Sequence, residues 1–451
     1  MKKFYKIFSL SITFLAVLAF SVFGLNLYEF SKINDNKFFT VLAQNENSDC
    51  KRTPIQLLKN RKQSNASQLK FNYKKAYGLK NEENSNLNYL DFSLKLFQNC
   101  YKNKNSNENV LISPLSVMVA LLMASAGASG ETKTQILNLL NIQSEIQAKN
   151  ELKNIFSSNE ENLKSANSLW VTDDENFSLN KNFEDNLKQE FDARTEKVDF
   201  LSEKAIQKIN DWCSEKTNGL IKHLVEEGDF SKDTLLSLIN AIYFDALWAE
   251  KYEAYDLSDR NFYGKDENKI VQFMNSTENV FIQGERESGF EKMYAGEKFS
   301  FVALLPNENI DIDEYVGGLS TDYLANLLKN KRNEKVDCYL PKFSSEFSSS
   351  LQSILNNMGM VNAFSPNLAD FSNLGKTKTG ENIYIDKIIH KSNIEVTPLG
   401  TKASAITMVM ISKCAMRDFS QNMVMLNRPF VYMINDTKTN LPVFIGVCEN
   451  V

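Results

Sequence analysis

Few residues in this chain have the types and spacing that catalysis requires. Only two histidines are present in 451 residues, His223 and His390, so a Ser–His or Cys–His mechanism has two candidate bases. The cysteines form no C-x-x-C pair, and no glycine-rich phosphate loop or G-x-S-x-G motif occurs in a strand–turn–helix setting. We therefore expect the protein to have no catalytic residue, no metal site and no cofactor. We also expect that it is not an enzyme. A secreted hydrolase that uses one of the histidines is the contrasting hypothesis.

Lys413 precedes a peptide bond of the type that trypsin-like proteases cut. Lys413 is followed by Cys414 and Ala415, near the end of a stretch that begins at Gly400. A lysine side chain fits the acidic specificity pocket of trypsin-like proteases, whereas cysteine is a poor specificity anchor.

The stretch before this bond has small residues at alternate positions. They are Thr401, Ala403, Ala405 and Thr407, and they follow Gly400. Because successive side chains of a strand face opposite ways, these four would share one face that needs almost no volume in a core. The pattern predicts a segment that can slide into a sheet, and it also fits an ordinary edge strand or loop.

Two further sets of residues indicate a capped helix and a buried strand. Ser113 and Pro114 have the order of a helix N-cap and first helical residue, and Ser116 follows in the first turn. The run from Leu235 to Trp248 is almost continuously apolar, as in a strand buried on both faces. Asn240 is polar inside that run and therefore needs a hydrogen-bond partner.

These residues, taken in chain order, resemble the serpin family from about residue 88 to the last residue. The matching segments, each at the family's place in the order, are Asn109–Ser116, Asn167–Trp170, Ile206–Gly219, Leu235–Trp248, Cys338–Phe343, Met358–Ser372, the stretch from Gly400, and Arg428–Phe430. The resemblance implies an α+β fold with a large, mostly antiparallel central sheet, two further sheets, about eight to nine helices and an exposed reactive-centre loop.

The resemblance also implies a function. In serpins the loop is bait for a serine protease, which becomes covalently attached as an acyl-enzyme while the cut loop enters the central sheet. Counted from Gly400, the family's commonest spacing implies cleavage between Cys414 and Ala415. The lysine favours cleavage between Lys413 and Cys414, one residue earlier, and this is the bond that we prefer. Residues of about 400–413 would then insert. Ser113, Pro114, Ser116, Asn240 and His390 match the region where the sheet opens, and the family pairs the asparagine with the histidine. Cross-inhibition of cysteine proteases is a further possibility.

The hinge departs from the pattern of inhibitory relatives. Pro398 stands where they usually have glutamate, and Lys402 replaces another usual glutamate. Proline lacks an N–H group and fixes φ, so the hinge could bend differently. A non-inhibitory serpin with a carrier, chaperone or storage role is therefore the alternative function.

Composition divides the chain into three parts. Residues 1–25 have a basic start and an apolar run, which predicts a signal peptide or an uncleaved signal anchor. Residues 26–87 include 11 asparagines and are expected to be a low-complexity, disordered leader. Residues 88–451 are the expected serpin domain, with a net charge of −13. An acidic domain argues against nucleic acid and against heparin as partners.

The segment 1–25 predicts a secreted, extracellular protein, or a lumenal one that is membrane-anchored if this segment is not cleaved. Such a protein would carry glycans on some of its N-x-S/T sequons, which lie at Asn65, Asn176, Asn275 and Asn435. We expect Asn435 to lie in a tight turn between two strands. We expect the protein to be a monomer with mostly free, buried cysteines.

Overall fold

The structure is a computed structural model, and it describes residues 86–106, 108–142, 144–157, 161–401 and 420–451. All of these residues belong to one compact unit, Lys80–Val451. The bonds Lys413–Cys414 and Cys414–Ala415, and the loop positions Ala403, Ala405 and Thr407, lie outside the described residues. Residues 1–85, which include Asn65, lie outside them as well, whereas residues 86 and 87, the end of the expected leader, are helical.

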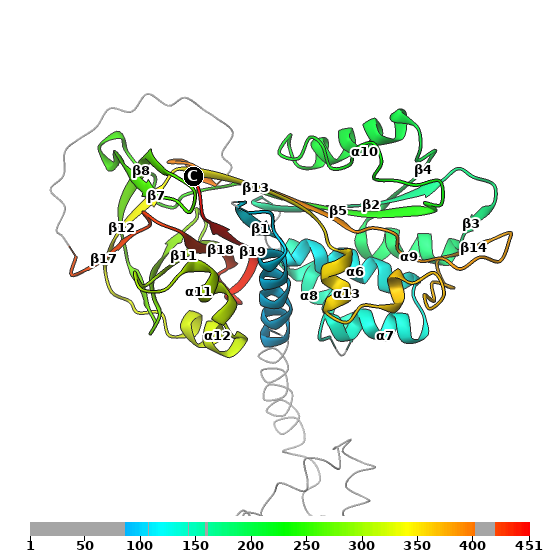
Figure 1. Ribbon diagram of the computed structural model, residues 1–451, viewed down its shortest axis with the longest axis horizontal. Coiled ribbons are helices and arrows are strands. Elements are labelled where there is room, and N and C mark those ends of the chain that lie inside the picture. Colours follow the sequence, from blue (N-terminus) through cyan, green and yellow to red (C-terminus); the bar gives the residue numbers. More distant parts are fainter. Residues whose placement is uncertain (1–85, 107, 143, 158–160, 402–419) are drawn as a thin grey trace, which may run out of the picture. The chain divides into compact units, whose positions relative to one another are not determined.

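Helices cover the sheets on several sides (Figure 1). Residues 86–102 are helical. Eight further α-helices are α6 (Pro114–Gly127), α7 (Gly130–Leu139), α8 (Glu145–Ser157), α9 (Lys181–Phe191), α10 (Glu203–Lys216), α11 (Ile312–Gly318), α12 (Thr321–Lys329) and α13 (Gln352–Asn357). Two short 3-10 helices are η1 (Ala254–Asp256) and η2 (Asn362–Phe364).

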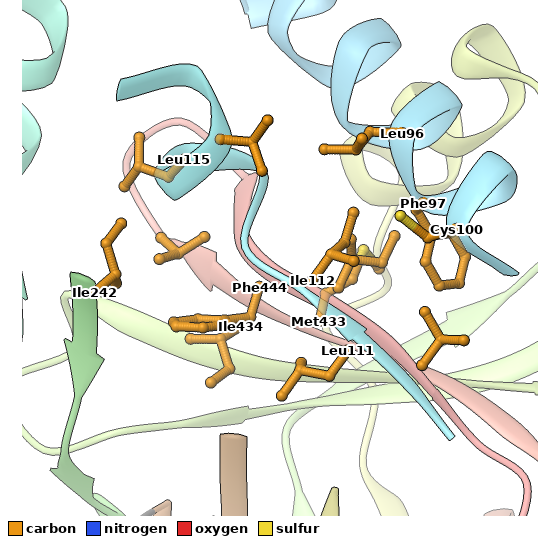
Figure 2. Close-up of a cluster of buried hydrophobic side chains, with 14 of the residues drawn as sticks. Leu96, Phe97, Cys100, Leu111, Ile112, Leu115, Ile242, Met433, Ile434 and Phe444 are labelled. Atoms are coloured by element: carbon orange, nitrogen blue, oxygen red, sulfur yellow. The ribbon is translucent and has the colours of Figure 1, made fainter. Parts of the chain in front are cut away.

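A six-stranded antiparallel sheet forms the most deeply buried part of the fold. Its strands, in spatial order, are β1 (Val110–Ile112), β19 (Leu441–Cys448), β18 (Phe430–Asp436), β11 (Phe299–Pro306), β10 (Glu287–Met293) and β9 (Val280–Gln283). Figure 2 shows Leu96, Phe97 and Cys100 of the helix at 86–102 beside Leu111 and Ile112 of β1. This apolar packing attaches the first helix to the sheet.

A second sheet has four strands. Its order is β17 (Asn422–Met425), β12 (Val336–Pro341), β8 (Asn268–Glu278) and β7 (Leu257–Tyr263). The strands β17 and β12 are parallel, and the other pairs are antiparallel. β17 is the first strand after the loop, so this sheet fixes the loop's far end.

The third and central sheet is divided into two halves. One half has the order β13 (Phe343–Ser350), β15 (Ile389–Val396), β16 (Gly400–Thr401) and β6 (Ala246–Leu247). The other has the order β4 (Arg194–Val198), β2 (Leu163–Thr172) and β5 (Leu236–Phe244). Only Asp245 separates β5 from β6, so the halves are joined at that end, while no ladder pairs the described strands β5 and β15. A small pair, β3 (Phe177–Leu179) with β14 (Gly375–Thr377), completes the sheets.

Strand β5 is buried on both faces, as its continuous apolar run predicts. Ile242 and Phe244 belong to the main core beneath the sheet, whereas Ile239 and Ala241 pack with Trp212 of α10 on the opposite face. Figure 1 shows α10 on one side of β5 and β2, with α6 and α9 on the other. The run therefore lacks the alternation of a half-exposed strand because helices cover both of its faces.

The expected fold is confirmed. The class is α+β, with a central sheet in which every pair but the parallel pair β2–β4 is antiparallel, two further large sheets, and nine α-helices among the described residues. Four cysteines, Cys100, Cys213, Cys338 and Cys448, are free and buried, as predicted. Within the described ranges, no helix combines the length and the apolar character needed to cross a membrane.

Candidate functional site at the hinge and the divided sheet

A tight turn carries the chain from β15 into β16. The N–H of Thr397 donates to the carbonyl of Gly400 at 2.9 Å, and the N–H of Gly400 donates back to the carbonyl of Thr397 at 3.2 Å. Pro398 and Leu399 are the two residues between them. Proline is favoured at the second position of common turns because its φ is already fixed near the required value. Pro398 therefore stabilises this turn, in which its missing N–H is not needed.

Gly400 lies where no side chain fits. A Cβ at this position would lie 2.1 Å from the carbonyl oxygen of Ala246 and 2.7 Å from the Cα of Leu247. The close approach lets β16 pair with β6 on one side and with β15 on the other. Thr401 lies opposite Ala246 of β6 and opposite Val396 of β15. The first two residues of the loop thus already form a strand between β15 and β6, where the two halves of the central sheet are joined.

The Thr401 side chain points into the core. It is 1% exposed, and its hydroxyl shares a hydrogen bond of 2.5 Å with the hydroxyl of Tyr294. Burial raises the pKa of Tyr294, which therefore remains a neutral hydrogen-bonding group. Since Thr401 faces inward, alternate residues after it would face inward as well if the strand continued.

An aromatic seat, formed by Trp248, Tyr252 and Tyr294, supports the turn. The indole N–H of Trp248 donates to the carbonyl of Thr397 at 2.8 Å. The backbone N–H of Tyr252 donates to the carbonyl of Pro398 at 3.3 Å. The rings of Trp248 and Tyr294 are stacked with centroids 4.5 Å apart. The hinge therefore rests on rigid side chains.

A buried cation lies under this seat. Lys292 is 1% exposed, and its ammonium is 2.7 Å from Glu278 and 4.5 Å from the centre of the Tyr252 ring. A buried ammonium needs such a carboxylate and ring face because it has lost its water. Lys292 was not predicted as a site residue. Its strand, Glu287–Met293, is mostly polar in sequence, so no local pattern indicated that it is buried.

Further along the sheet, the start of α6 meets β15. Ser113 caps α6 as predicted, accepting from the N–H of Ser116 at 3.2 Å, with Pro114 in the first turn. The N–H of Ser113 donates to Nε2 of His390 at 3.3 Å, and the Ser392 hydroxyl lies 2.8 Å from the same nitrogen. Nε2 accepts the backbone bond, so the ring is neutral with its proton on Nδ1. Burial lowers the pKa of His390 to about 4, which agrees with a neutral ring.

The expected hydrogen bond between Asn240 and His390 is not among those of the described residues, and that prediction was wrong. The Asn240 amide instead donates to Ser165 and to Asn167, each at 2.8 Å, within its own half of the sheet. Its Oδ1 is buried without a hydrogen-bond partner in the described structure. The physical reason is that β5 and β15 belong to halves that are not paired here.

A cavity of about 610 Å³ lies between the two halves at the end far from the hinge. One wall is the start of β5, Leu235–Ile239, and the other is the segment Ile383–Ile389 that leads into β15. Leu121 and Ala124 of α6 also line it. The cavity therefore has mainly apolar walls and lies where the halves of the sheet are unpaired.

Two expectations about chemistry can be compared with the structure. No group of three or more His, Cys, Asp or Glu residues in the described ranges could hold a metal ion. The Ser392–His390 contact is the type of bond that activates a nucleophile, but both side chains are buried, at 3% and 5% exposure, and no substrate can reach them.

The sequons differ in accessibility. Asn176 is exposed and Asn275 is half-buried in β8. Asn435 is fully buried within β18, and the turn that we expected to contain it spans residues 437–440. The prediction for Asn435 was wrong because β18 extends three residues beyond the apolar run of Phe430–Met433 that indicated it.

Comparison with known proteins places this geometry in a family. Residues 87–451 match the family model described as Serpin (serine protease inhibitor). An uncharacterized serpin-like protein of Thermococcus kodakarensis is 33% identical over 352 residues, covering 76% of this chain and 80% of the relative. A leukocyte elastase inhibitor of Xenopus tropicalis is 32% identical over 355 residues, covering 75% and 92%. The chain belongs to the serpin family.

The fold agrees with this assignment. The crystal structure of the thermophilic serpin tengpin in its native state superposes with a TM-score of 0.73 at 37% identity, covering 81% of this chain and 94% of that one. Membership indicates protease inhibition as the general activity and a target protease as the general partner.

Proposed function

We propose that this protein is a secreted suicide-substrate inhibitor of trypsin-like serine proteases. The protease cuts at or next to Lys413–Cys414, remains attached as an acyl-enzyme, and is trapped when residues of about 400–413 enter the central sheet. The supporting observation is that Gly400 and Thr401 already pair with β15 on one side and β6 on the other.

The register of these two residues predicts where the rest of the loop would lie. Continued residue for residue, it places Ala403 beside Phe244 and Ile394, Ala405 beside Ile242 and Ser392, and Thr407 beside Asn240 and His390. Every one of these neighbours except Asn240 is buried, and Asn240 is half-buried. Small side chains are what such a row requires, because added volume in a packed core is destabilising.

The same register would place Thr407 between two polar side chains. Its hydroxyl would lie in the row between His390 and Asn240, whose Oδ1 has no hydrogen-bond partner among the described residues. A buried polar atom without a partner is costly, so satisfying it would favour insertion. Asn240 and His390 are thus linked through an inserted strand in this proposal, rather than directly.

The distal part of the loop has different chemistry and a different destination. Residues 408–412, Met-Val-Met-Ile-Ser, would reach the cavity between Leu235–Ile239 and Ile383–Ile389. Apolar side chains suit these walls. About a dozen added residues, at roughly 1 kcal/mol net per hydrogen bond, give on the order of 10 kcal/mol to drive insertion.

The proposal includes a monomeric, extracellular protein, with cysteine proteases as possible secondary targets. Lys402 would lie on the outward face of the inserted strand, where a charge is tolerated. Because Pro398 stabilises the hinge turn, it does not favour the alternative of a non-inhibitory carrier, chaperone or storage serpin.

Incubation with trypsin and with chymotrypsin tests the proposal. We expect an SDS-stable complex with trypsin and a released carboxy-terminal peptide whose mass identifies the cut bond. Cleavage without any stable complex, for both proteases and at every ratio, would favour the non-inhibitory alternative. Hydrolysis of a test ester that is lost on His223→Gln or His390→Gln would instead indicate a hydrolase.

A further inference from the structure

One ion pair links the two halves of the central sheet beside the cavity. The Lys387 ammonium lies 2.5 Å from Oδ1 of Asp229, with the side chains 36% and 21% exposed. Lys387 is two residues before β15, and Asp229 lies in the segment between α10 and β5. The two residues also line the cavity from its two sides.

Each partner is attached to its own half. The segment that carries Asp229 is held to α10, because Oδ1 of Asn210 accepts from the N–H groups of Leu224 and Val225 at 2.8 and 3.0 Å. The segment that carries Lys387 is held to the other half, since the carbonyl of Ile388 accepts from the N–H of Leu351 at 2.8 Å. A relative movement of the halves is therefore transmitted to the ion pair.

A strand inserted between β5 and β15 would pass between these two segments. Neighbouring strands of a sheet are about 4.8 Å apart, so the inserted strand would fill the space between β5 and β15. The register from Thr401 places residue 410 of an inserted strand at the level of Lys387. The side-chain contact between Lys387 and Asp229 crosses the path of this strand and has to be released.

We propose that Lys387 and Asp229 form a clasp that holds the sheet closed at the cavity, and that its release is a step in sheet opening. The inference rests on the proposed function, because it assumes that a strand can enter. The pair is partly exposed, so its strength is modest and falls with added salt. We expect its loss to accelerate opening about two- to fivefold.

A second ion pair on the same half provides a matched control. Lys391, four residues beyond Lys387, lies 2.8 Å from Glu346. Those residues belong to β15 and β13, which are paired with each other on one side of the division. Insertion between β5 and β15 does not separate them, so Lys391→Met should not alter the rate of opening.

The test measures opening without a protease. A synthetic peptide with the sequence of residues 400–413 is incubated with the intact full chain, and its uptake is followed by native mass spectrometry and by resistance to heat. We expect Lys387→Met and Asp229→Asn to take up the peptide two- to fivefold faster than wild type. We also expect salt to accelerate wild type but not these variants, and the exchange K387D/D229K to restore the slower rate.

The outcomes separate the two proposals. If wild type takes up no peptide and gains no heat stability when its own loop is cut, insertion and the proposed function are both contradicted. If wild type takes up the peptide, but Lys387→Met and Asp229→Asn do so at the wild-type rate, the clasp alone is overturned. It is likewise overturned if Lys391→Met is accelerated equally. Unchanged circular dichroism of each variant before incubation shows that it has folded.

Discussion

Gly400 is the residue on which the first pairing of the loop depends. Its substitution to alanine would place a Cβ 2.1 Å from the carbonyl of Ala246, and the strand would have to move away. Overpacking of this kind costs roughly 1–3 kcal/mol. We predict that Gly400→Ala delays insertion, so that more protease escapes by hydrolysis and several times more inhibitor is consumed per enzyme inactivated.

A control for this prediction exists elsewhere in the chain. Gly317 in α11 has open space where its Cβ would be. Gly317→Ala should therefore leave the ratio of inhibitor to inactivated protease unchanged. Equal ratios for wild type and Gly400→Ala would show that the pairing of β16 does not limit insertion.

His390 gives the fold a specific dependence on pH. Its pKa is about 4 in the folded protein, whereas an unfolded histidine has a pKa of about 6.5. The unfolded chain therefore binds the proton first, and this contribution to stability is lost as pH falls from 6.5 towards 4. At pH 5 the loss from this group is about 2 kcal/mol.

Urea unfolding at pH 7.5 and pH 5.0 measures this effect. We predict that the stability of His390→Gln falls about 2 kcal/mol less than that of wild type between these two pH values. The exposed residue His223 supplies the control, and His223→Gln should behave as wild type does. If His390→Gln and wild type lose equal stability, the neutral, buried state of His390 is contradicted.

At the scale of elements, the turn between β15 and β16 decides how the loop starts. Pro398 limits the conformations that the chain can adopt before the turn forms. It therefore favours the turn that the hydrogen bonds between Thr397 and Gly400 close. Pro398→Ala should weaken this turn by about 0.5–1 kcal/mol. We predict a slower trapping step, measured by stopped flow with a fluorescent protease, together with an unchanged rate of initial binding.

The opposite change in the trapping rate of Pro398→Ala would contradict this prediction. A faster trapping step would mean that proline hinders the hinge, as the sequence alone suggested. Leu368, a 57% exposed residue in the turn before Ala369, is a site at which an alanine substitution should have no effect on either rate.

Much of the element structure could be predicted from the sequence because its signals are local. The cap at Ser113 and Pro114 and the buried run around Asn240 are read from neighbouring residues, and both are confirmed. The partners of Asn240 and the seat under the hinge were not predictable in this way. They depend on which strands pair and on how far apart they lie, and no local pattern encodes the division between β5 and β15.

At the scale of the whole molecule, the central sheet is incomplete. One end is closed by β16 between β15 and β6, and the other has a cavity of about 610 Å³ and an ion pair across it. Between these ends, Oδ1 of Asn240 has no hydrogen-bond partner among the described residues. An inserted strand would add hydrogen bonds on both sides and fill the cavity, so the cleaved form should be far more stable than the intact one.

The midpoint of heat denaturation before and after cleavage of the loop tests this central claim most directly. The intact chain is cut within residues 402–419, the two fragments are left associated, and both forms are heated under the same conditions. We predict a rise of about 13 °C on cleavage, because on the order of 10 kcal/mol is added to a domain of about 364 residues, whose unfolding entropy is roughly 0.8 kcal/mol/K. An unchanged or lower midpoint, with the cut verified by mass, would contradict insertion.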